Sequence, residues 1–151
     1  MLARAYEAQD FDALYKLDKS CFPRGIAYSK TTLRYFLGLS SAECLVAVEK
    51  DDIAGFILSE LDGPVAHIIT LDVAELHRRS GVGSLLLNAA ERSLYAQGVR
   101  GMYLETAVNN HAAVNFWSRH GYIVEGTLKR YYLSRIDGYE MRKAFRPGQE
   151  Q

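Results

Sequence analysis

Apolar residues recur along this chain in two alternating patterns, one with the spacing of helices and one with the spacing of strands. Between residues 11 and 21, and again between residues 33 and 37, they return every three or four positions, which predicts two short helices. Asp10 and Ser29 precede these segments and are suitable N-caps. Pro23 lies between the two segments and breaks the helical pattern.

Strand patterns fill much of the rest of the first half. We expect a short strand at Ala3–Ala8, followed by three longer apolar segments at Cys44–Val48, Ile53–Leu61 and Val65–Val73. Short polar turns join the three longer segments, which predicts an antiparallel meander. In the last segment, alternation divides the side chains between two faces of a strand: Ile69, Leu71 and Val73 on one, Ile68, Thr70 and Asp72 on the other.

The second half continues with helix and strand patterns in turn. A helix is predicted at Val82–Leu94, then a strand at Gly101–Val108, then a short helix that Asn109 or Asn110 caps. Two further strands are expected at the end, Tyr122–Tyr132 and Tyr139–Phe145. The predicted order is therefore β-α-α-β-β-β-α-β-α-β-β, an α/β class with a mixed sheet. We expect one domain over residues 1–146 and a frayed tail at residues 147–151.

Composition narrows the class of protein. The chain has 151 residues, with 18 basic and 18 acidic side chains, so its net charge is zero with neutral histidines. Strong nucleic-acid binding is not expected, because such proteins usually carry a basic excess. Cys21 and Cys44 form no CxxC pair and are expected to be buried thiols in a reducing cytoplasm. No apolar run approaches the ~20 residues that span a membrane, and no signal peptide is recognised, so we expect a cytoplasmic protein without a membrane partner.

The histidines do not suggest a metal site. His67, His77, His111 and His120 show no HExxH or other ligand spacing, so we interpret them as surface residues or satisfied core residues. The chain also lacks the GxSxG and Cys–His signatures of nucleophilic hydrolases.

The segment HRRSGVGS, at residues 77–84, joins a predicted strand to a predicted helix. The first turn of a helix leaves backbone N–H groups without intrahelical partners, and the helix dipole adds partial positive charge there. Gly81 and Gly83 lack the Cβ atoms that would keep a ligand away, and Arg78 and Arg79 add formal charge. The segment therefore predicts an anion site for a phosphate or pyrophosphate.

Two well-known phosphate loops do not match this segment. A P-loop requires a lysine that is absent here, and a dinucleotide fingerprint requires a third glycine where this chain has Leu86. The alternative interpretation is structural: the glycines allow close packing at a helix start and the arginines face solvent.

Residues 78–83, RRSGVG, resemble the pyrophosphate loop of the GNAT acyl-CoA-dependent N-acetyltransferases, which reads Gln or Arg, two residues, Gly, one residue, then Gly or Ala. Other segments are similar to the same family: LDV at 71–73, LET at 104–106 and NNHAAVNFWSRHGY at 109–122. KRYY at 129–132 and DGYEM at 137–141 resemble the subgroup that acetylates protein N-termini, such as the bacterial and archaeal ribosomal-protein alanine N-acetyltransferases. The resemblance covers nearly the whole chain.

The resemblance implies the GNAT fold, with acetyl-CoA as co-substrate and no metal. In that fold the sheet splays between the strands at Val65–Val73 and Gly101–Val108, and the cofactor enters the gap. Backbone groups of the first strand would hold the pantetheine arm, and amides of the loop would hold the pyrophosphate. The residues implied to bind the cofactor are Leu71, Val73, Arg78, Arg79, Ser80, Gly81, Val82, Gly83, Ser84, Asn110 and Trp117.

By the same resemblance, Glu105 is the candidate general base, acting through a water. The alternative is a solvated residue or a partner of an arginine. The acceptor chemistry favours an α-amine, whose pKa is about 8, over a lysine, whose pKa is about 10.4. A modest carboxylate base is therefore sufficient for a protein N-terminus.

Trp117 stands where the family usually supplies a tyrosine that protonates the leaving thiolate. Indole N–H is not a usable acid near neutral pH, so water or another tyrosine would take this role. The candidates are Tyr122, Tyr131, Tyr132 and Tyr139.

Tyr131 and Tyr132 match the paired tyrosines that hold the acceptor's first residues in the N-terminal acetyltransferases, although aromatic residues are frequent in strands anyway. Tyr28, and less directly Phe22, are candidates to line the same groove.

The leading interpretation is thus an N-acetyltransferase acting on a protein N-terminus, such as that of a ribosomal protein. Two alternatives stay open: an acetyltransferase of small amines, and an acyl-CoA-binding module without catalysis. The sequence leaves open the acceptor's first residues, the length of the acyl group and the oligomeric state.

Overall fold

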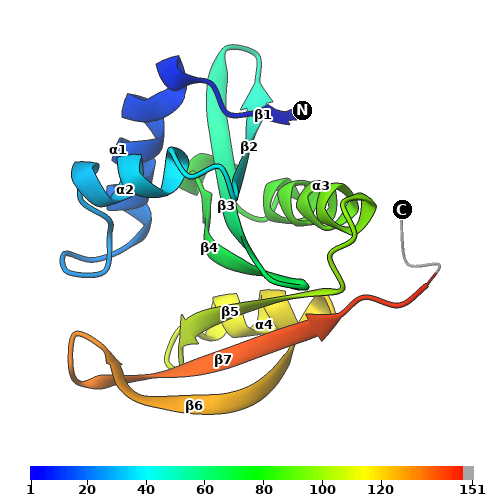
Figure 1. Ribbon diagram of the computed structural model, residues 1–151. Helices are drawn as coiled ribbons and strands as arrows, with labels where there is room; N and C mark the ends of the chain where they lie inside the picture. Colours follow the sequence, from blue (N-terminus) through cyan, green and yellow to red (C-terminus); the bar gives the residue numbers. More distant parts are fainter. Residues whose placement is uncertain (148–151) are drawn as a thin grey trace.

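The structure, a computed structural model, describes residues 1–147 and consists of a seven-stranded mixed sheet with helices on both faces (Figure 1). The strand order across the sheet is β1-β2-β3-β4-β5-β7-β6. The strands are β1 Leu2–Ala5, β2 Ala42–Glu49, β3 Asp52–Asp62, β4 Val65–Val73, β5 Gly101–Ala107, β6 Ile123–Tyr132 and β7 Ile136–Ala144. The helices are α1 Phe11–Cys21, α2 Lys30–Leu37, α3 Val82–Ala96 and α4 His111–Arg119, with 3-10 turns at Ala8–Asp10 and Glu75–His77.

This order confirms the predicted succession of helices and strands, with small shifts of their ends. β7 begins three residues before the predicted strand, at Ile136. Most of the tail expected to fray, residues 148–151, lies outside the described residues.

The first strand is shorter than predicted, because Asp10 draws the chain into a turn. The Asp10 carboxylate accepts a hydrogen bond from the Glu7 amide at 2.8 Å and two more from the Arg4 guanidinium at 2.8 and 3.0 Å. These contacts stabilise the 3-10 turn at Ala8–Asp10 in place of the strand predicted to reach Ala8. Asp10 was also predicted to cap α1, and it does precede that helix, but its side chain makes no cap hydrogen bond there.

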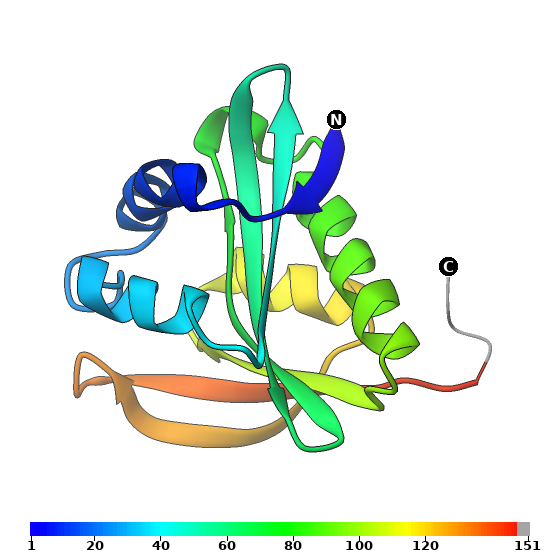
Figure 2. The ribbon, with the colours of Figure 1, turned by 45° about the horizontal axis from the view of Figure 1, so that its top comes forward.

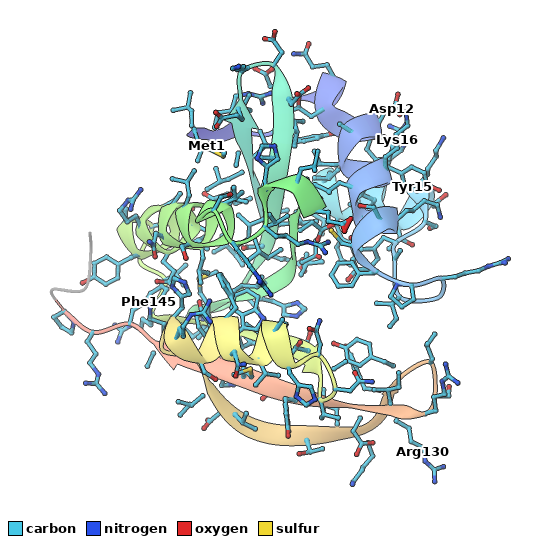
Figure 3. The ribbon with its side chains drawn as sticks, turned by 180° about the vertical axis from the view of Figure 1, so that it is seen from behind. Met1, Asp12, Tyr15, Lys16, Arg130 and Phe145 are labelled. Carbon is cyan, nitrogen blue, oxygen red and sulfur yellow. The ribbon has the colours of Figure 1, made fainter. Side chains whose placement is uncertain are left out.

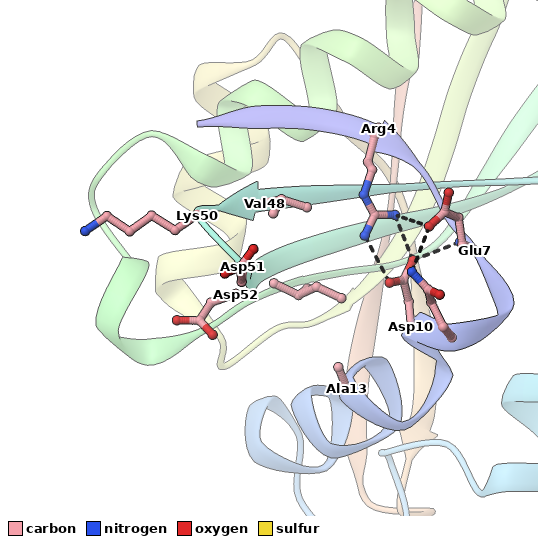
Figure 4. A pocket seen from close by; sticks show the side chains of 10 residues that line it. Arg4, Glu7, Asp10, Ala13, Val48, Lys50, Asp51 and Asp52 are labelled. Atoms are coloured by element: carbon pink, nitrogen blue, oxygen red, sulfur yellow. Dashed lines mark hydrogen bonds and ion pairs between the residues drawn. The ribbon is translucent and has the colours of Figure 1, made fainter.

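Figure 4 shows this ion pair at the rim of an open hollow of about 690 Å³, beside the turn between β2 and β3. Charged side chains from that turn, from β1 and from residues 7–10 line the hollow. It lies at the β1 edge of the sheet.

Two hydrophobic clusters hold the layers together. The larger packs α3 and α4 against one face of the sheet, with Leu86, Leu87 and Trp117 among its buried members. The smaller packs α1 and α2 against the other face, through Phe11, Leu14 and Leu33. Figure 2 shows α1 and α2 on one side of the upright strands and α3 on the opposite side.

A β-bulge in β4 overturns the predicted distribution of its side chains. Leu58 of β3 pairs with Thr70, and the next residue of β3, Ser59, pairs with Ile68, so Ile69 is the extra residue. Ile69 packs with the cluster beneath α1 and α2, whereas Leu71 and Val73 pack with the cluster beneath α3. The prediction that Ile69, Leu71 and Val73 share a face was therefore wrong, because the bulge shifts the alternation by one residue.

β4 and β5 separate soon after they begin, which confirms the splayed sheet that the resemblance implied. Their parallel pairing is limited to Ala66 with Met102 and His67 with Tyr103. Beyond these pairs β5 continues alongside β7 (Figure 1), in a regular antiparallel register from Gly101 to Ala107. The two halves of the sheet thus form a fork whose base is at His67.

The β6–β7 hairpin reaches back to the loop between α1 and α2. Figures 1 and 2 both show its tip under this loop, and Figure 3 labels Arg130 at the tip. A Cβ atom added to Gly25 of the loop would lie 2.7 Å from Cδ2 of Leu133. The loop and the hairpin are therefore in direct contact across the open side of the fork.

Candidate active site

Glu105 lies on β5 just beyond the base of the fork. In register, Glu105 pairs with Glu140 on β7. The His67–Tyr103 pair at the base of the fork lies two residues earlier along β5. The Glu105 side chain is 16% exposed, so it is sheltered but open to solvent. The predicted base therefore lies just past the point where the pairing of β4 and β5 ends.

Glu105 has a specific partner, which the sequence interpretation did not identify. Nε2 of His67 lies 2.7 Å from Oε1 of Glu105. His67 was interpreted as a surface or satisfied core residue, and it is partly buried and hydrogen-bonded. Its ring stacks on Tyr103 with centroids 4.6 Å apart and an interplanar angle of 17°. No sequence spacing indicated this pair, because it depends on the parallel register of β4 and β5.

The predicted acceptor residues come together around Glu105. Burial raises the pKa of the Tyr28 hydroxyl to about 12, with a further contribution from nearby negative groups that include Glu105. Burial also raises the pKa of Tyr131 and of Tyr132, and the charge of Glu105 adds to both shifts. All three hydroxyls therefore remain protonated near neutral pH and can donate hydrogen bonds to an acceptor.

Aromatic packing fixes these tyrosines. The rings of Tyr131 and Tyr132 meet edge to face at 4.9 Å, and Tyr28 meets Phe36 of α2 in the same way at 5.6 Å. Tyr131 is 52% exposed and stands at the hairpin end of this group. Phe22, the less direct candidate, follows α1 directly and is partly buried.

A pair of buried carboxyl groups holds the loop that carries Tyr28. Asp18 of α1 accepts a hydrogen bond from the Tyr28 amide at 2.7 Å, and it contacts Asp72 of β4. Asp72 also accepts from the Thr70 hydroxyl at 2.5 Å. Burial, together with the Asp18 contact, raises the pKa of Asp72 well above its ordinary value. One proton shared between the two groups satisfies their remaining oxygens, which have no other donor among the described residues.

The glycine-rich loop has the geometry of an anion site. Gly81 adopts φ 87°, a left-handed conformation that favours glycine, and it precedes α3 as the N-cap without a side-chain cap. The first hydrogen bond of the helix runs from the Leu85 amide to the Gly81 carbonyl, so the preceding amides remain available. A Cβ atom at Gly81 would meet nothing within 4 Å. The residues here therefore fit a pyrophosphate, which the free amides would bind.

The arginines of the loop differ in their surroundings. Arg78 turns back to the end of β4, where its Nε donates to the Val73 carbonyl at 3.1 Å. The Cys21 thiol lies 3.5 Å from the same carbonyl, and Arg78 approaches the thiol at 3.6 Å. Arg79, with φ 64°, is exposed at the turn. The Ser80 hydroxyl donates to the His77 carbonyl and closes the turn.

Helix α4 packs against the start of α3. Ser84 and His120 are hydrogen-bonded at 2.9 Å, and a Cβ atom at Gly83 would lie 3.1 Å from Cε1 of Phe116. Asn110 is the N-cap of α4, because its side chain accepts from the Ala113 amide at 3.2 Å. Phe116 and His120 were not among the predicted site residues.

Trp117 belongs to the main hydrophobic cluster. It is 7% exposed and lies between Phe116 and Tyr122, with ring centroids 5.0 and 5.4 Å away. Tyr122 is buried as well, and its hydroxyl donates to Glu91 of α3 at 2.8 Å. Tyr122 is therefore committed to Glu91 and is a poor candidate for the acid that protonates a leaving thiolate.

Two features are absent from residues 1–147, the part of the chain that the structure describes. No helix in this part of the chain has both the length and the apolar character needed to cross a membrane. In the same residues, no cluster of three or more His, Cys, Asp or Glu side chains is arranged to hold a metal ion.

Comparison with known proteins identifies the same family that the sequence motifs resemble. A sequence profile of the acetyltransferase (GNAT) family matches residues 11–122. N-alpha-acetyltransferase 30 of Schizosaccharomyces pombe is 30% identical over 117 residues, which cover 74% of this chain and 78% of that protein. Longer relatives are matched in part: the chain spans only 33% of human N-alpha-acetyltransferase 30, at 28% identity.

Solved structures have the same fold. The ribosomal-protein-S18-alanine N-acetyltransferase from Escherichia coli superposes with a TM-score of 0.89 at 19% identity, covering 99% of this chain and 97% of that one. Chaetomium thermophilum Naa20, in complex with a bisubstrate analogue, superposes with a TM-score of 0.80 at 27% identity, covering 96% of this chain and 87% of that one.

Proposed function

This chain belongs to the acetyltransferase (GNAT) family, and we propose that it transfers the acetyl group of acetyl-CoA to the α-amine of a protein N-terminus, with Glu105 as the general base. The observation that carries the proposal is the convergence of Glu105 with Tyr28, Tyr131 and Tyr132 at the open side of the fork. The named activity of the relatives, N-alpha-acetylation, supports the same acceptor.

The acceptor would enter between the α1–α2 loop and the β6–β7 hairpin. An extended peptide fits a groove with an aromatic wall on each side, and the contact between Gly25 and Leu133 brings the two walls together. The tyrosine hydroxyls would donate to backbone carbonyls of the first residues. The α-amine, at the end of the peptide, would then lie closest to the carboxylate of Glu105.

The chemistry follows from this placement. Glu105 accepts a proton from the acceptor ammonium, directly or through a water, and leaves a neutral amine. The amine nitrogen attacks the acetyl carbonyl carbon, a C–N bond forms and the C–S bond to coenzyme A breaks, and the second proton of the attacking nitrogen passes to solvent water as the amide forms. A thiol has a pKa of about 8.5, so coenzyme A can leave as the thiolate and take its proton from solvent water.

The cofactor residues would act in three groups. Backbone groups of Leu71 and Val73 would hold the pantetheine arm where β4 leaves β5. The amides between Arg79 and Ser84 would bind the pyrophosphate. Asn110 would contact the pantetheine or the acetyl end through its amide NH2, because its oxygen caps α4.

The proposal is tested by thiol release from acetyl-CoA with three matched acceptors. These are a peptide with a free α-amine, the same peptide with a blocked α-amine, and the blocked peptide with one added lysine. Turnover with the first alone is the expected result. Turnover with the lysine peptide but not with the free α-amine would contradict the N-terminal acceptor, and binding of acetyl-CoA without any turnover would contradict catalysis.

A further inference from the structure

Positive charge is concentrated on the two walls of the proposed acceptor groove. Residues 19–30, which include the α1–α2 loop, contain three basic and no acidic side chains, and residues 129–136, at the tip of the β6–β7 hairpin, also contain three basic and no acidic side chains. The whole chain, by contrast, has 18 basic and 18 acidic side chains. We call these basic residues the basic rim: Lys19, Arg24, Lys30, Lys129, Arg130 and Arg135.

The side chains of the basic rim are exposed, and most of their charge is not neutralised within the protein. Lys129 forms an ion pair with Asp137 at 3.4 Å, and Asp137 also accepts from the Arg130 amide at 2.9 Å. The other members of the rim, Lys19, Arg24, Lys30 and Arg135, form no ion pair with any carboxylate of residues 1–147. One carboxyl group therefore serves a rim of six cations.

Two cations of the rim converge on a single aromatic ring. Nζ of Lys19, at the end of α1, lies 5.1 Å from the centroid of Tyr15, and Nζ of Lys30, at the start of α2, lies 5.3 Å from the same centroid. The ring attracts each ammonium, but the two like charges repel each other. A negatively charged group bound beside them would offset this repulsion.

The two walls bring their cations to the same end of the groove. A Cβ atom added to Gly25 would lie 2.7 Å from Cδ2 of Leu133, so the loop and the hairpin touch there. Arg24 is the neighbour of Gly25, and Arg135 follows Leu133 by two residues. Figure 3 shows Arg130 at this outer end of the hairpin.

The inner end of the groove has the opposite charge. Glu105 of β5 pairs in register with Glu140 of β7, and Ile136, where β7 begins at the hairpin tip, lies four residues before Glu140. A strand rises about 3.3 Å per residue, so roughly 13 Å separates the two ends. An extended peptide covers this distance with about four residues. The groove is therefore negative where the α-amine would lie and positive about four residues further out.

We infer that the acceptor is a peptide with acidic side chains from about its fourth residue onward, which the basic rim binds while the α-amine reaches Glu105. This inference rests on the proposed function and defines its substrate class. Single exposed ion pairs contribute little, but several acting on one peptide select its charge and favour its encounter with the enzyme. RNA is the other anionic polymer that suits a basic surface. The zero net charge of the chain and the position of the cations at the groove favour the peptide.

Three peptides with a free α-amine and the same first three residues test the inference. They differ only at the next three residues, which are Asp, Asn or Lys. The kcat/KM of the wild type is expected to fall in the order Asp, Asn, Lys, with about 3- to 30-fold between the Asp and Lys peptides at low salt, as for two or three exposed ion pairs. The difference should nearly vanish in about 1 M salt, where the Debye length is ~3 Å.

Charge reversal on both walls tests whether the rim makes this selection. In the double variant Arg24→Glu/Arg135→Glu, the ratio of kcat/KM for the Asp peptide to that for the Lys peptide is expected to fall to about one or below. The ratio is measured within one variant, so a general loss of activity or of folded protein cancels. Lys50→Glu/Arg92→Glu is the matched control, because it changes the net charge equally at exposed positions on the β2–β3 turn and on α3. It should keep the wild-type ratio.

The outcomes separate this inference from the proposed function. Equal kcat/KM for the three peptides would overturn the acidic acceptor and leave N-terminal acetylation intact. A preference for the Asp peptide that persists in Arg24→Glu/Arg135→Glu would also overturn the role of the rim. If a single-stranded RNA oligonucleotide binds the wild type but not this variant, and the peptides are used equally, the rim binds RNA instead. No turnover with any peptide would remove the proposed function and, with it, this inference.

Discussion

The carboxyl groups of Asp18 and Asp72 contact each other in the interior, between α1 and the part of β4 that follows its bulge. Asp18 and Asp72 are 0% and 1% exposed, and Asp18 also accepts from the Tyr28 amide. Two ionised carboxylates so placed would repel, so the pair retains a proton. The proton links α1, β4 and the loop that carries Tyr28.

The pair predicts a specific dependence of stability on pH. The pKa of Asp72 is raised in the folded state, mainly by burial, so the native protein keeps a proton that the unfolded chain releases above about pH 4. The resulting stability is complete below the unfolded pKa and is lost as the pH rises through the folded pKa. Asp72→Asn mimics the protonated form at every pH, since its NH2 can donate to Asp18. We expect it to raise Tm at pH 8 by a few degrees and to raise it by less at pH 5.

Thermal unfolding of the wild type and Asp72→Asn between pH 5 and pH 9 tests this expectation. Asp12→Asn, which removes an exposed carboxyl of the same helix, is the control and should follow the wild-type curve. Parallel curves for wild type and Asp72→Asn would contradict a shared proton.

A second prediction concerns the anion site. Asp at position 83 would place a carboxylate in the first turn of α3, among the amides proposed to bind the pyrophosphate. We expect Gly83→Asp to weaken acetyl-CoA binding about 100-fold or more, because like charges within a few Å repel by several kcal/mol in partly buried sites. The helix itself should not suffer, since an acidic residue at a helix N-terminus is favourable.

The steric effect must be separated from the charge, because a Cβ atom here already approaches Phe116 at 3.1 Å. Gly83→Asn has the shape of Asp without its charge and is the matched control. Isothermal calorimetry should show a much larger loss of acetyl-CoA affinity for Asp than for Asn. Equal affinities of the two variants would mean that no phosphate lies beside this turn.

The sequence was sufficient to predict the helices and strands and their order, because each segment has a clear apolar period and marked ends. It failed where a side-chain contact or a strand pairing overrides the local pattern. The Arg4–Asp10 pair turns the first strand early, and the bulge at Ile69 inverts the faces of β4. A bulge of this kind adds one residue to one strand only, and strict alternation cannot reveal it.

The candidate site also has one part that the sequence could predict and another that it could not. The glycine turn before α3 could be predicted, because its glycines and the helix start are all local in the sequence. His67 could not, because its contact with Glu105 requires the register of two strands that lie 38 residues apart in sequence. Phe116 and His120 were missed for the same reason, since they reach the start of α3 from α4.

A third prediction assigns Tyr122 to stability. Its hydroxyl donates to Glu91, whose other oxygen binds Lys143 of β7 at 2.8 Å. We expect Tyr122→Phe to lower the free energy of unfolding by about 1.5–3 kcal/mol, as for a hydrogen bond to a charged group. Turnover at saturating substrates should be unchanged. A loss of kcat with wild-type stability in denaturant would instead make Tyr122 part of the chemistry.

A fourth prediction concerns the proposed acceptor groove, whose two walls, the α1–α2 loop and the β6–β7 hairpin, meet at Gly25 and Leu133. Gly25 has φ 92°, and a Cβ atom there would lie 2.7 Å from Leu133 Cδ2. Gly25→Ala should therefore push the loop and the hairpin apart and raise the KM for an acceptor peptide several-fold, with acetyl-CoA affinity unchanged. Leu133→Ala in the same chain removes the clash and should restore part of the KM.

Gly98 supplies the matched control for this experiment. It also has φ 92°, but a Cβ atom there would meet nothing within 4 Å, and it follows α3 away from the groove. Gly98→Ala carries the same backbone strain, about 1–2 kcal/mol, and should leave the acceptor KM unaffected. An equal KM change in Gly25→Ala and Gly98→Ala would show that strain alone is responsible. A change confined to Gly25, and relieved by Leu133→Ala, would place the acceptor between the loop and the hairpin.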